Sequence, residues 1–246
     1  MSKGGVDTAC LSPGATARPS GEAAVVIEFG DRIDPAAQDA VRRLTVALDA
    51  APPPGTIEVV PTYRSVLIAF DPAATTADAI IAALPSVGDS GASGEAREWI
   101  VPVCLADAMA EDLFELADAL DIEPDAVRAR LLANPLRVGM YGFVPGAAYL
   151  TGLDPALHVP RRATPRPPIP AGSLIVAVGQ AVICPVAMPT GWYVVGRTAA
   201  RMFDADAGGG RAPVPFAVGD VLHLKGVSTD AFAALADDPT GGVRGR

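Results

Sequence analysis

Residues 173–185 read Ser-Leu-Ile-Val-Ala-Val-Gly-Gln-Ala-Val-Ile-Cys-Pro, which are two short apolar runs separated by a glycine and a glutamine. Similar short runs follow at residues 192–195 and 221–224, among further glycines and prolines, and helical periodicity nearly vanishes from residue 136 onward. Many short strands joined by turn residues are typical of a β-barrel or a β-sandwich. We therefore predict an all-β domain over residues 136–236.

The residues before this domain alternate between strand and helix patterns. Asp34 can cap a helix that Pro35 begins, and the apolar residues that follow recur every three or four positions on one face. The predicted elements are a strand at 23–29, this helix, strands at 57–60 and 65–70, a second helix at 75–84 and a strand at 99–105. This β-α-β-β-α-β order predicts a ferredoxin-like α+β domain over residues 21–105.

The segments around these two domains are expected to be linkers or tails. Residues 106–135 carry two amphipathic helix patterns and are predicted to be bridging helices between the domains. Residues 1–20 are rich in glycine, serine, alanine and proline and lack the apolar stretch of a signal peptide, which predicts a disordered tail. Residues 237–246 are predicted to be a second tail.

Composition excludes several classes of protein. The 246 residues carry a formal net charge of −9, which argues against binding to nucleic acid or to an anionic membrane, since both require an excess of lysine and arginine. The three cysteines, Cys10, Cys104 and Cys184, form no CxxC pair, and no run approaches the roughly 20 apolar residues of a membrane helix. We therefore expect a soluble protein of the cytoplasm.

Three arginines, Arg161, Arg162 and Arg166, lie within the stretch Pro-Arg-Arg-Ala-Thr-Pro-Arg. Each guanidinium can hold a carboxylate or phosphate through two parallel hydrogen bonds, and the flanking prolines keep the backbone extended. The stretch therefore indicates an anion-binding site. A second interpretation is equally open, in which Arg161 and Arg162 pair with some of the 28 acidic residues of the chain.

Other polar positions are weaker signals. The segments 141–146 and 169–173 are turns of a kind that brings backbone amides close to a ligand, although such turns more often only reverse the chain. Gln180 can hydrogen-bond an amide substrate or cap a turn. The two histidines, His158 and His223, are too few for a His-rich metal site, so no metal is predicted, and no GxxxxGK[ST] phosphate loop occurs.

Taken together and in order, the motifs of the chain become specific. In the first half they are Glu28-Phe29-Gly30, Ile33-Asp34-Pro35, Val59-Val60-Pro61, Tyr63-Arg64-Ser65, Asp71-Pro72 and Val101-Pro102-Val103-Cys104. In the second half they are Gly142-Phe143-Val144-Pro145-Gly146, Tyr149-Leu150, Gly152-Leu153, Pro160-Arg161-Arg162, Pro165-Arg166, Pro170-Ala171-Gly172-Ser173, Gly179-Gln180, Pro185, Gly191-Trp192 and Gly196-Arg197-Thr198. Over roughly residues 21–224 the chain closely resembles the family that contains KipI and the B component of 5-oxoprolinase.

This resemblance implies an amino-terminal α+β domain followed by a cyclophilin-like β-barrel. It also implies an enzyme subunit in a hydrolase complex that opens 5-oxo-L-proline to L-glutamate with ATP, in which a homologous C component and a separate A component are the partners. ATP then belongs to the complex and need not be bound by this chain. On this hypothesis Arg162 and Gln180 are catalytic, and the substrate-binding residues are Arg161, Arg166, Gly172, Ser173, Pro145, Gly146 and Arg197.

Two alternatives stay open within the same family. Related domains form the carboxyltransferase part of biotin-dependent urea carboxylase, for which biotin would be the cofactor, and one member inhibits a sporulation histidine kinase. The chain departs from the family pattern at four positions. Leu105 and Cys184 each stand where the family usually has tyrosine, Ala147 stands where an aromatic residue is common, and Ala181 stands where threonine is usual. These departures indicate a divergent member, with either a different substrate or only the partner interface retained.

Overall fold

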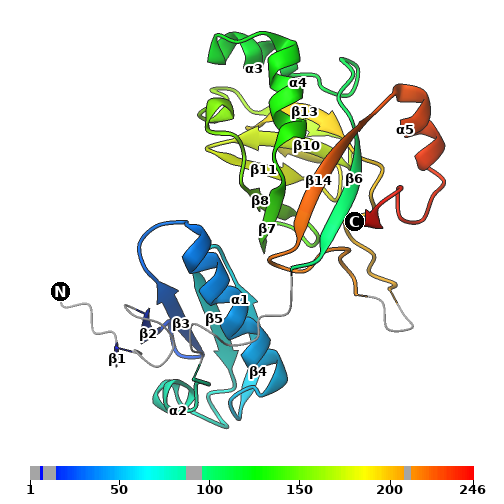
Figure 1. The fold of residues 1–246 in the computed structure, drawn as a ribbon. Helices are drawn as coiled ribbons and strands as arrows, with labels where there is room; N and C mark the ends of the chain where they lie inside the picture. The colour runs from blue at the N-terminus through cyan, green and yellow to red at the C-terminus, as the bar shows by residue number, and fades with distance from the viewer. Residues whose placement is uncertain (1–5, 8–14, 87–95, 208–211) are drawn as a thin grey trace. The chain divides into compact units, whose positions relative to one another are not determined.

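The computed structural model describes residues 6–7, 15–86, 96–207 and 212–246 (Figure 1). The chain divides into two compact units, Met1–Glu95 and Ala96–Arg246. Each unit has its own apolar core, so each is described by itself. Among the described residues no helix combines the length and the apolar character that crossing a bilayer requires.

The first unit is a five-stranded sheet with two helices against one of its faces. Its elements are β1 (Val6–Asp7), β2 (Ala15–Pro19), β3 (Ala24–Phe29), α1 (Pro35–Ala50), β4 (Thr56–Pro61), β5 (Ser65–Phe70) and α2 (Ala77–Ala82). The predicted helix start is confirmed, because the Asp34 carboxylate accepts a hydrogen bond from the Ala37 amide at 2.8 Å and Pro35 occupies the first turn. Val41 and Leu44 of α1 are buried against Ile27 and Ile68 in the same core cluster.

The ferredoxin-like arrangement predicted for residues 21–105 is not confirmed. The sheet order is β1-β2-β3-β5-β4, so β2 lies beside β3, and the strand predicted at residues 99–105 is not part of this sheet. Residues 15–19, which were predicted to belong to a disordered tail, instead form this strand, with Ala15 and Ala17 fully buried. Their alternation with Thr16 and Arg18 has the period of a strand, but alanine contributes too little apolar area to reveal it.

The second unit is built on a β-barrel, as predicted from the short apolar runs. Its main sheet has the order β13-β10-β11-β8-β7-β14-β6-β15, and a further pairing of Arg197 with Cys104 joins β13 to β6 and closes the ring. A separate two-stranded sheet pairs β12 with β9. The elements are β6 (Glu98–Cys104), α3 (Leu113–Leu120), α4 (Pro124–Ala133), β7 (Leu136–Tyr141), β8 (Ala148–Thr151), η1 (Pro155–Leu157), β9 (Arg166–Ile169), β10 (Ser173–Ala177), β11 (Gln180–Ile183), β12 (Met188–Thr190), β13 (Tyr193–Arg197), β14 (Val221–Val227), α5 (Thr229–Leu235) and β15 (Arg244–Gly245).

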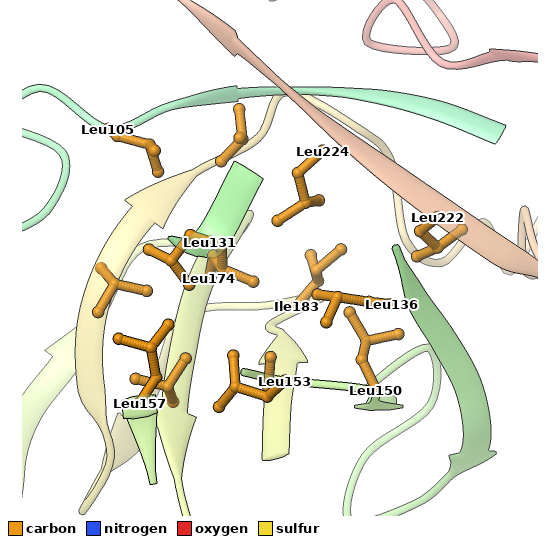
Figure 2. Packing of buried hydrophobic residues seen from close by; sticks show 14 of the residues in the cluster. Leu105, Leu131, Leu136, Leu150, Leu153, Leu157, Leu174, Ile183, Leu222 and Leu224 are labelled. Atoms are coloured by element: carbon orange, nitrogen blue, oxygen red, sulfur yellow. The ribbon is translucent and has the colours of Figure 1, made fainter. Parts of the chain in front are cut away.

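Large aliphatic side chains fill the inside of the barrel (Figure 2). Leu150, Leu174 and Leu222 come from three different strands and are at most 1% exposed. Leu116 of α3 and Leu131 of α4 belong to the same cluster. The two helices therefore pack within the second unit, whereas their sequence predicted a bridge between domains.

Strand β6 also belongs to the barrel and not to the first unit. It runs parallel to β14 over seven residue pairs, from Val221 opposite Glu98 to Val227 opposite Cys104. Partners more than a hundred residues apart leave no trace in the local pattern, so the assignment of this strand to the first domain was wrong. The carboxyl-terminal residues are ordered as well, since β15 pairs with β6 and the Asp238 carboxylate accepts from the Thr240 amide at 2.8 Å. The tail predicted at 237–246 is thus wrong.

Candidate functional site

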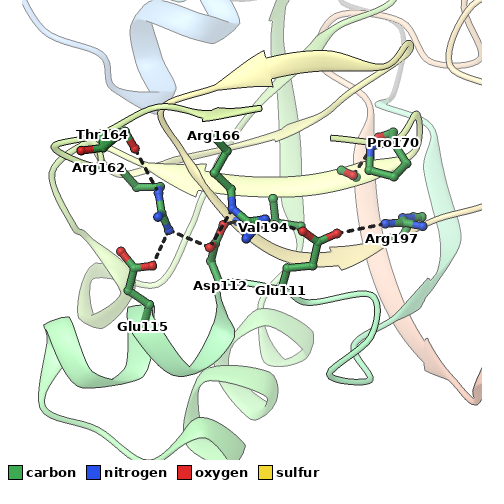
Figure 3. Close-up of polar contacts among 10 residues, drawn as sticks. Glu111, Asp112, Glu115, Arg162, Thr164, Arg166, Pro170, Val194 and Arg197 are labelled. Atoms are coloured by element: carbon green, nitrogen blue, oxygen red, sulfur yellow. Dashed lines mark hydrogen bonds and ion pairs between the residues drawn. The ribbon is translucent and has the colours of Figure 1, made fainter. Parts of the chain in front are cut away.

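A buried carboxylate, Asp112, stands at the centre of an ion-pair network on the second unit (Figure 3). Asp112 precedes α3 and is 2% exposed. Its Oδ1 accepts a hydrogen bond from Arg162 Nη1 at 2.6 Å and lies 3.1 Å from Arg166 Nε. Its Oδ2 accepts from the Val194 amide of β13 at 2.9 Å, while the Asp112 amide donates to the Val194 carbonyl at 2.9 Å. The carboxylate therefore joins the arginine-rich segment to the barrel.

Two glutamates complete what we call the Asp112 network, which consists of Glu111, Asp112, Glu115, Arg162, Arg166 and Arg197. Arg162 Nη1 lies 2.5 Å from Glu115 Oε2, and Arg166 forms an ion pair with Glu111. Glu111 also lies 3.5 Å from Arg197 Nη2. Three positive and three negative side chains thus neutralise one another.

Burial raises the pKa of the Asp112 carboxyl, and the Val194 amide, Arg166 and Arg162 oppose that shift. Arg162 and Arg166 were predicted to bind an anionic ligand. The second interpretation, pairing with acidic residues of the chain, describes the contacts of Arg162 but not those of Arg161, and Arg166 is paired in the same way as Arg162. Arg162 already contacts Glu115 and Arg166 already contacts Glu111, so an anion would compete with these carboxylates for the two guanidiniums.

Gly172 and Ser173, whose amides were predicted to orient a substrate, use those amides within the protein. The Gly172 amide donates to the Cys184 carbonyl at 2.7 Å, and the Ser173 amide donates to the Pro170 carbonyl at 3.3 Å. Gly172 has φ +79°, and a Cβ there would lie 2.1 Å from the Thr198 carbonyl oxygen. The two residues therefore shape a tight turn against the end of β13.

The structure brings some of the predicted site residues together and separates another. Gly172 approaches Arg197 and Thr198, and Gly146 lies against Met202, where a Cβ would meet the carbonyl oxygen at 2.6 Å. Both turns thus converge on the segment that follows β13.

Gln180 lies at the other end of the β10–β11 hairpin. It pairs with Ala177 next to a tight turn at Val178 and Gly179, which both have positive φ. At about 3.3 Å per residue, β10 places Gln180 about 13 Å from Ser173. The structure therefore does not bring Gln180 to the Gly172 turn.

The segment 141–147, which includes Pro145 and Gly146, presents an aromatic side chain that sequence reasoning did not single out. Phe143 has φ +70° and is 76% exposed. The Val144 amide donates to the Gly142 carbonyl at 2.9 Å across it, which makes a γ-turn of the strained kind. Residues 141–145 line a shallow pocket of about 300 Å³. The Gly-Phe-Val-Pro-Gly motif marks this segment in the sequence, but the strained backbone and the exposed Phe143 side chain are visible only in the structure.

Arg161 differs from the other arginines of its segment. Its guanidinium carbon lies 5.9 Å from the ring centroid of Trp192, and it forms no ion pair with any residue that the structure describes. Tyr149 packs edge-on against the same Trp192 ring, with the centroids 6.0 Å apart. Burial raises the pKa of the Tyr149 hydroxyl, and the nearby Arg161 charge opposes that shift.

The four departures from the family pattern all lie in apolar cores. Leu105 and Ala181 belong to the barrel interior, and Ala147 and Cys184 belong to a smaller cluster around Trp192. All four residues are at most 6% exposed. These four side chains therefore pack in the apolar cores of the second unit. No group of three or more His, Cys, Asp or Glu side chains within the described part of the chain is arranged to hold a metal ion.

We expect the Cys184 thiol to be inert in the folded protein. Burial raises its pKa to about 12, so almost no thiolate is present at neutral pH. Treatment with iodoacetamide at about pH 8 should leave Cys184 unmodified, and unfolding in guanidinium should expose it to full alkylation. Peptide mapping by mass spectrometry measures both states. Alkylation of native Cys184 at the rate of an unfolded control would contradict this assignment.

Comparison with known proteins identifies the family to which this chain belongs. Residues 15–211 match the carboxyltransferase domain family, subdomains C and D, so the chain has the fold of a carboxyltransferase-type module. The chain is 27% identical to the B component of 5-oxoprolinase from Bacillus subtilis (strain 168) over 89% of this chain and 95% of that protein. It is 32% identical to the corresponding component from Escherichia coli O157:H7 over 75% of this chain and 84% of that protein. The chain belongs to the carboxyltransferase domain family as a divergent B component of the 5-oxoprolinase type.

Solved structures show the same fold. The crystal structure of TTHA0988 is 29% identical, with a TM-score of 0.73 over 84% of this chain, and this chain spans 40% of that longer one. The K. lactis urea amidolyase matches 96% of this chain with a TM-score of 0.74, and this chain spans 16% of it. At 20% identity the second likeness concerns the fold alone.

Proposed function

We propose that this chain is one subunit of a cytoplasmic, ATP-dependent complex of the 5-oxoprolinase type, which opens 5-oxo-L-proline to L-glutamate. The observation that carries the proposal is the match to the B component of 5-oxoprolinase along 95% of the Bacillus subtilis protein. A homologous C component and a separate A component are the proposed partners. Ring opening adds water across the lactam C–N bond, and ATP hydrolysis in the complex drives it.

Features of the chain support a site that is completed by another polypeptide. The charged residues of the Asp112 network pair with one another, and their charges sum to zero. The chain contains no GxxxxGK[ST] loop for ATP. TTHA0988, in which a matching region occupies 40% of one chain, is an example of this module joined to further protein. We therefore place ATP binding on another polypeptide of the complex.

The predicted site residues have different roles in this proposal. Arg161 is the residue most able to contact an anionic substrate, because its charge is not compensated by a carboxylate of the described residues. Arg162, Arg166 and Arg197 hold the segment in place through the Asp112 network. The role proposed for Gln180 would need a substrate that reaches the other end of the hairpin.

Reconstitution tests the proposed function directly. The A and C components from the same source should release glutamate from 5-oxo-L-proline with ATP only when this chain is added, because a complex of this kind needs every polypeptide to assemble its site. Glutamate is quantified by an enzyme-coupled assay, and omission of ATP is the control. Equal turnover by the A and C components without this chain would refute the proposal.

The alternative function, a carboxyltransferase subunit of a biotin-dependent enzyme, is favoured by the family match over residues 15–211. It becomes the better account if this chain forms a stable complex with the C component that opens no 5-oxo-L-proline. Carboxyl transfer from a carboxybiotin carrier to urea, followed with labelled carbonate, is then the assay.

A further inference from the structure

Four arginines lie on or near β13, and only three of them are paired with carboxylates. Arg162, Arg166 and Arg197 are paired with Glu111, Asp112 and Glu115. Arg161 is exposed and has no carboxylate partner among the described residues. A guanidinium without a carboxylate partner leaves a local positive charge in a chain whose net charge is −9.

The Arg161 guanidinium lies against one of two aromatic rings that pack together. Trp192 is 7% exposed, its amide donates to Thr190 Oγ1 at 3.0 Å, and its ring is fixed in the cluster that also contains Val194. Tyr149 packs edge-on against that ring, and its hydroxyl finds no hydrogen-bond partner among the residues that the structure describes. Arg161 and Tyr149 therefore both contact the Trp192 ring, and each carries a hydrogen-bond donor.

The backbone holds Arg161 in this position. The Arg162 amide donates to the Gly191 carbonyl at 2.8 Å, which ties the segment to the residue before Trp192. The Arg162 side chain is anchored at the same time by Asp112. Because these contacts fix the neighbouring residue, little backbone entropy would be lost when Arg161 takes up a ligand.

A second Arg–Trp pair in the same unit shows what a purely structural pair looks like. The Arg97 guanidinium carbon lies 5.0 Å from the Trp99 ring centroid. Arg97 Nη2 lies 2.7 Å from Asp220 Oδ2, and the Trp99 indole N–H donates to the same oxygen at 2.8 Å. In that pair both the charge and the indole donor are satisfied by the protein. At Arg161 the corresponding carboxylate is missing from the described residues.

We propose that Arg161 and Tyr149, which both contact the Trp192 ring, form a binding site for a small carboxylate, with the guanidinium and the phenol donating to the carboxylate. Under the proposed function, on which the choice of ligand rests, that carboxylate is the one on 5-oxo-L-proline. A shallow, exposed site of this kind should bind in about the millimolar range.

The chain offers a built-in reporter for this site. It contains two tryptophans, so its ¹⁵N-labelled spectrum has two indole N–H signals, which Trp99→Phe assigns. Titration with 5-oxo-L-proline should shift the Trp192 signal along a saturable curve and leave the Trp99 signal in place. The same ring without a carboxylate, 2-pyrrolidinone, should give no saturable shift.

Variants separate the proposed contact from general charge effects. Arg161→Gln should weaken binding about tenfold or more, since it removes a charge-assisted hydrogen bond, and Tyr149→Phe should weaken it a few-fold. Arg201→Gln removes one positive charge from a side chain that is 65% exposed and should leave binding unchanged. An absent shift, an equal shift with 2-pyrrolidinone, or unchanged binding in Arg161→Gln would each overturn the site.

The binding result and the reconstitution result can fail independently. Turnover by the complete complex without binding to this chain would overturn the carboxylate site and leave the proposed function standing. Saturable binding that requires Arg161, with no glutamate released by the complex, would keep the site and overturn the proposed function.

Discussion

Gly172→Ala is expected to lower the free energy of unfolding of the second unit by about 3 kcal/mol, since positive φ and backbone overlap each cost about 1–3 kcal/mol. Gly172 has φ +79°, and the added methyl group would lie 2.1 Å from the Thr198 carbonyl oxygen. A backbone atom cannot move aside as the end of a flexible side chain can. The Thr198 amide also donates to the Gly172 carbonyl at 2.9 Å, so moving the turn breaks that contact as well.

Urea unfolding followed by tryptophan fluorescence measures this effect. Trp99 and Trp192 both lie in the second unit, so the signal reports on that unit alone. Gly191→Ala is the matched control, because its Cβ would meet no atom within 4 Å and its φ is ordinary. A loss in Gly172→Ala no larger than in Gly191→Ala would show that the turn can relax, and would contradict the close packing against Thr198.

The elements that could be predicted from sequence are those determined by neighbours along the chain. Asp34 and Pro35 mark the start of α1, and the two runs in 173–185 become the β10–β11 hairpin. Where long-range pairing decides, prediction failed. The sequence of β6 predicts a strand, but only its long-range pairs with β14, β13 and β15 assign it to the barrel. Likewise Ser228 caps α5, a helix that was not predicted from the sequence and none of whose residues is buried.

The candidate site shows the same limit. The arginine-rich segment was evident from composition, but its partners lie some fifty residues earlier, in a stretch that resembles the solvated start of a helix. Nothing local to Asp112 indicates that its carboxylate is buried. The contrast between Arg161 and Arg162, adjacent in sequence, follows from the direction of each side chain, which a motif does not contain.

Asp112→Ala is expected to lower the free energy of unfolding of the second unit by about 2–3 kcal/mol, below the roughly 3–5 kcal/mol typical of a broken buried pair. The carboxylate is 2% exposed and satisfies Arg162, Arg166 and the Val194 amide. Its removal leaves a backbone donor of β13 without its side-chain acceptor. The loss stays at the lower value because Glu115 and Glu111 still hold the two arginines, whose side chains are partly exposed.

The same fluorescence-detected urea unfolding measures this variant, and Glu115→Gln is its control. Glu115 belongs to the same network but is 53% exposed, so its loss should cost less than about 1 kcal/mol. If Asp112→Ala and Glu115→Gln were equally mild, Asp112 would not be the centre of the network. The large effect expected of Asp112 follows from its position, because it is the buried carboxylate of the network and its two oxygens join Arg162 to the Val194 amide of β13. Its loss removes this bridge next to Arg161.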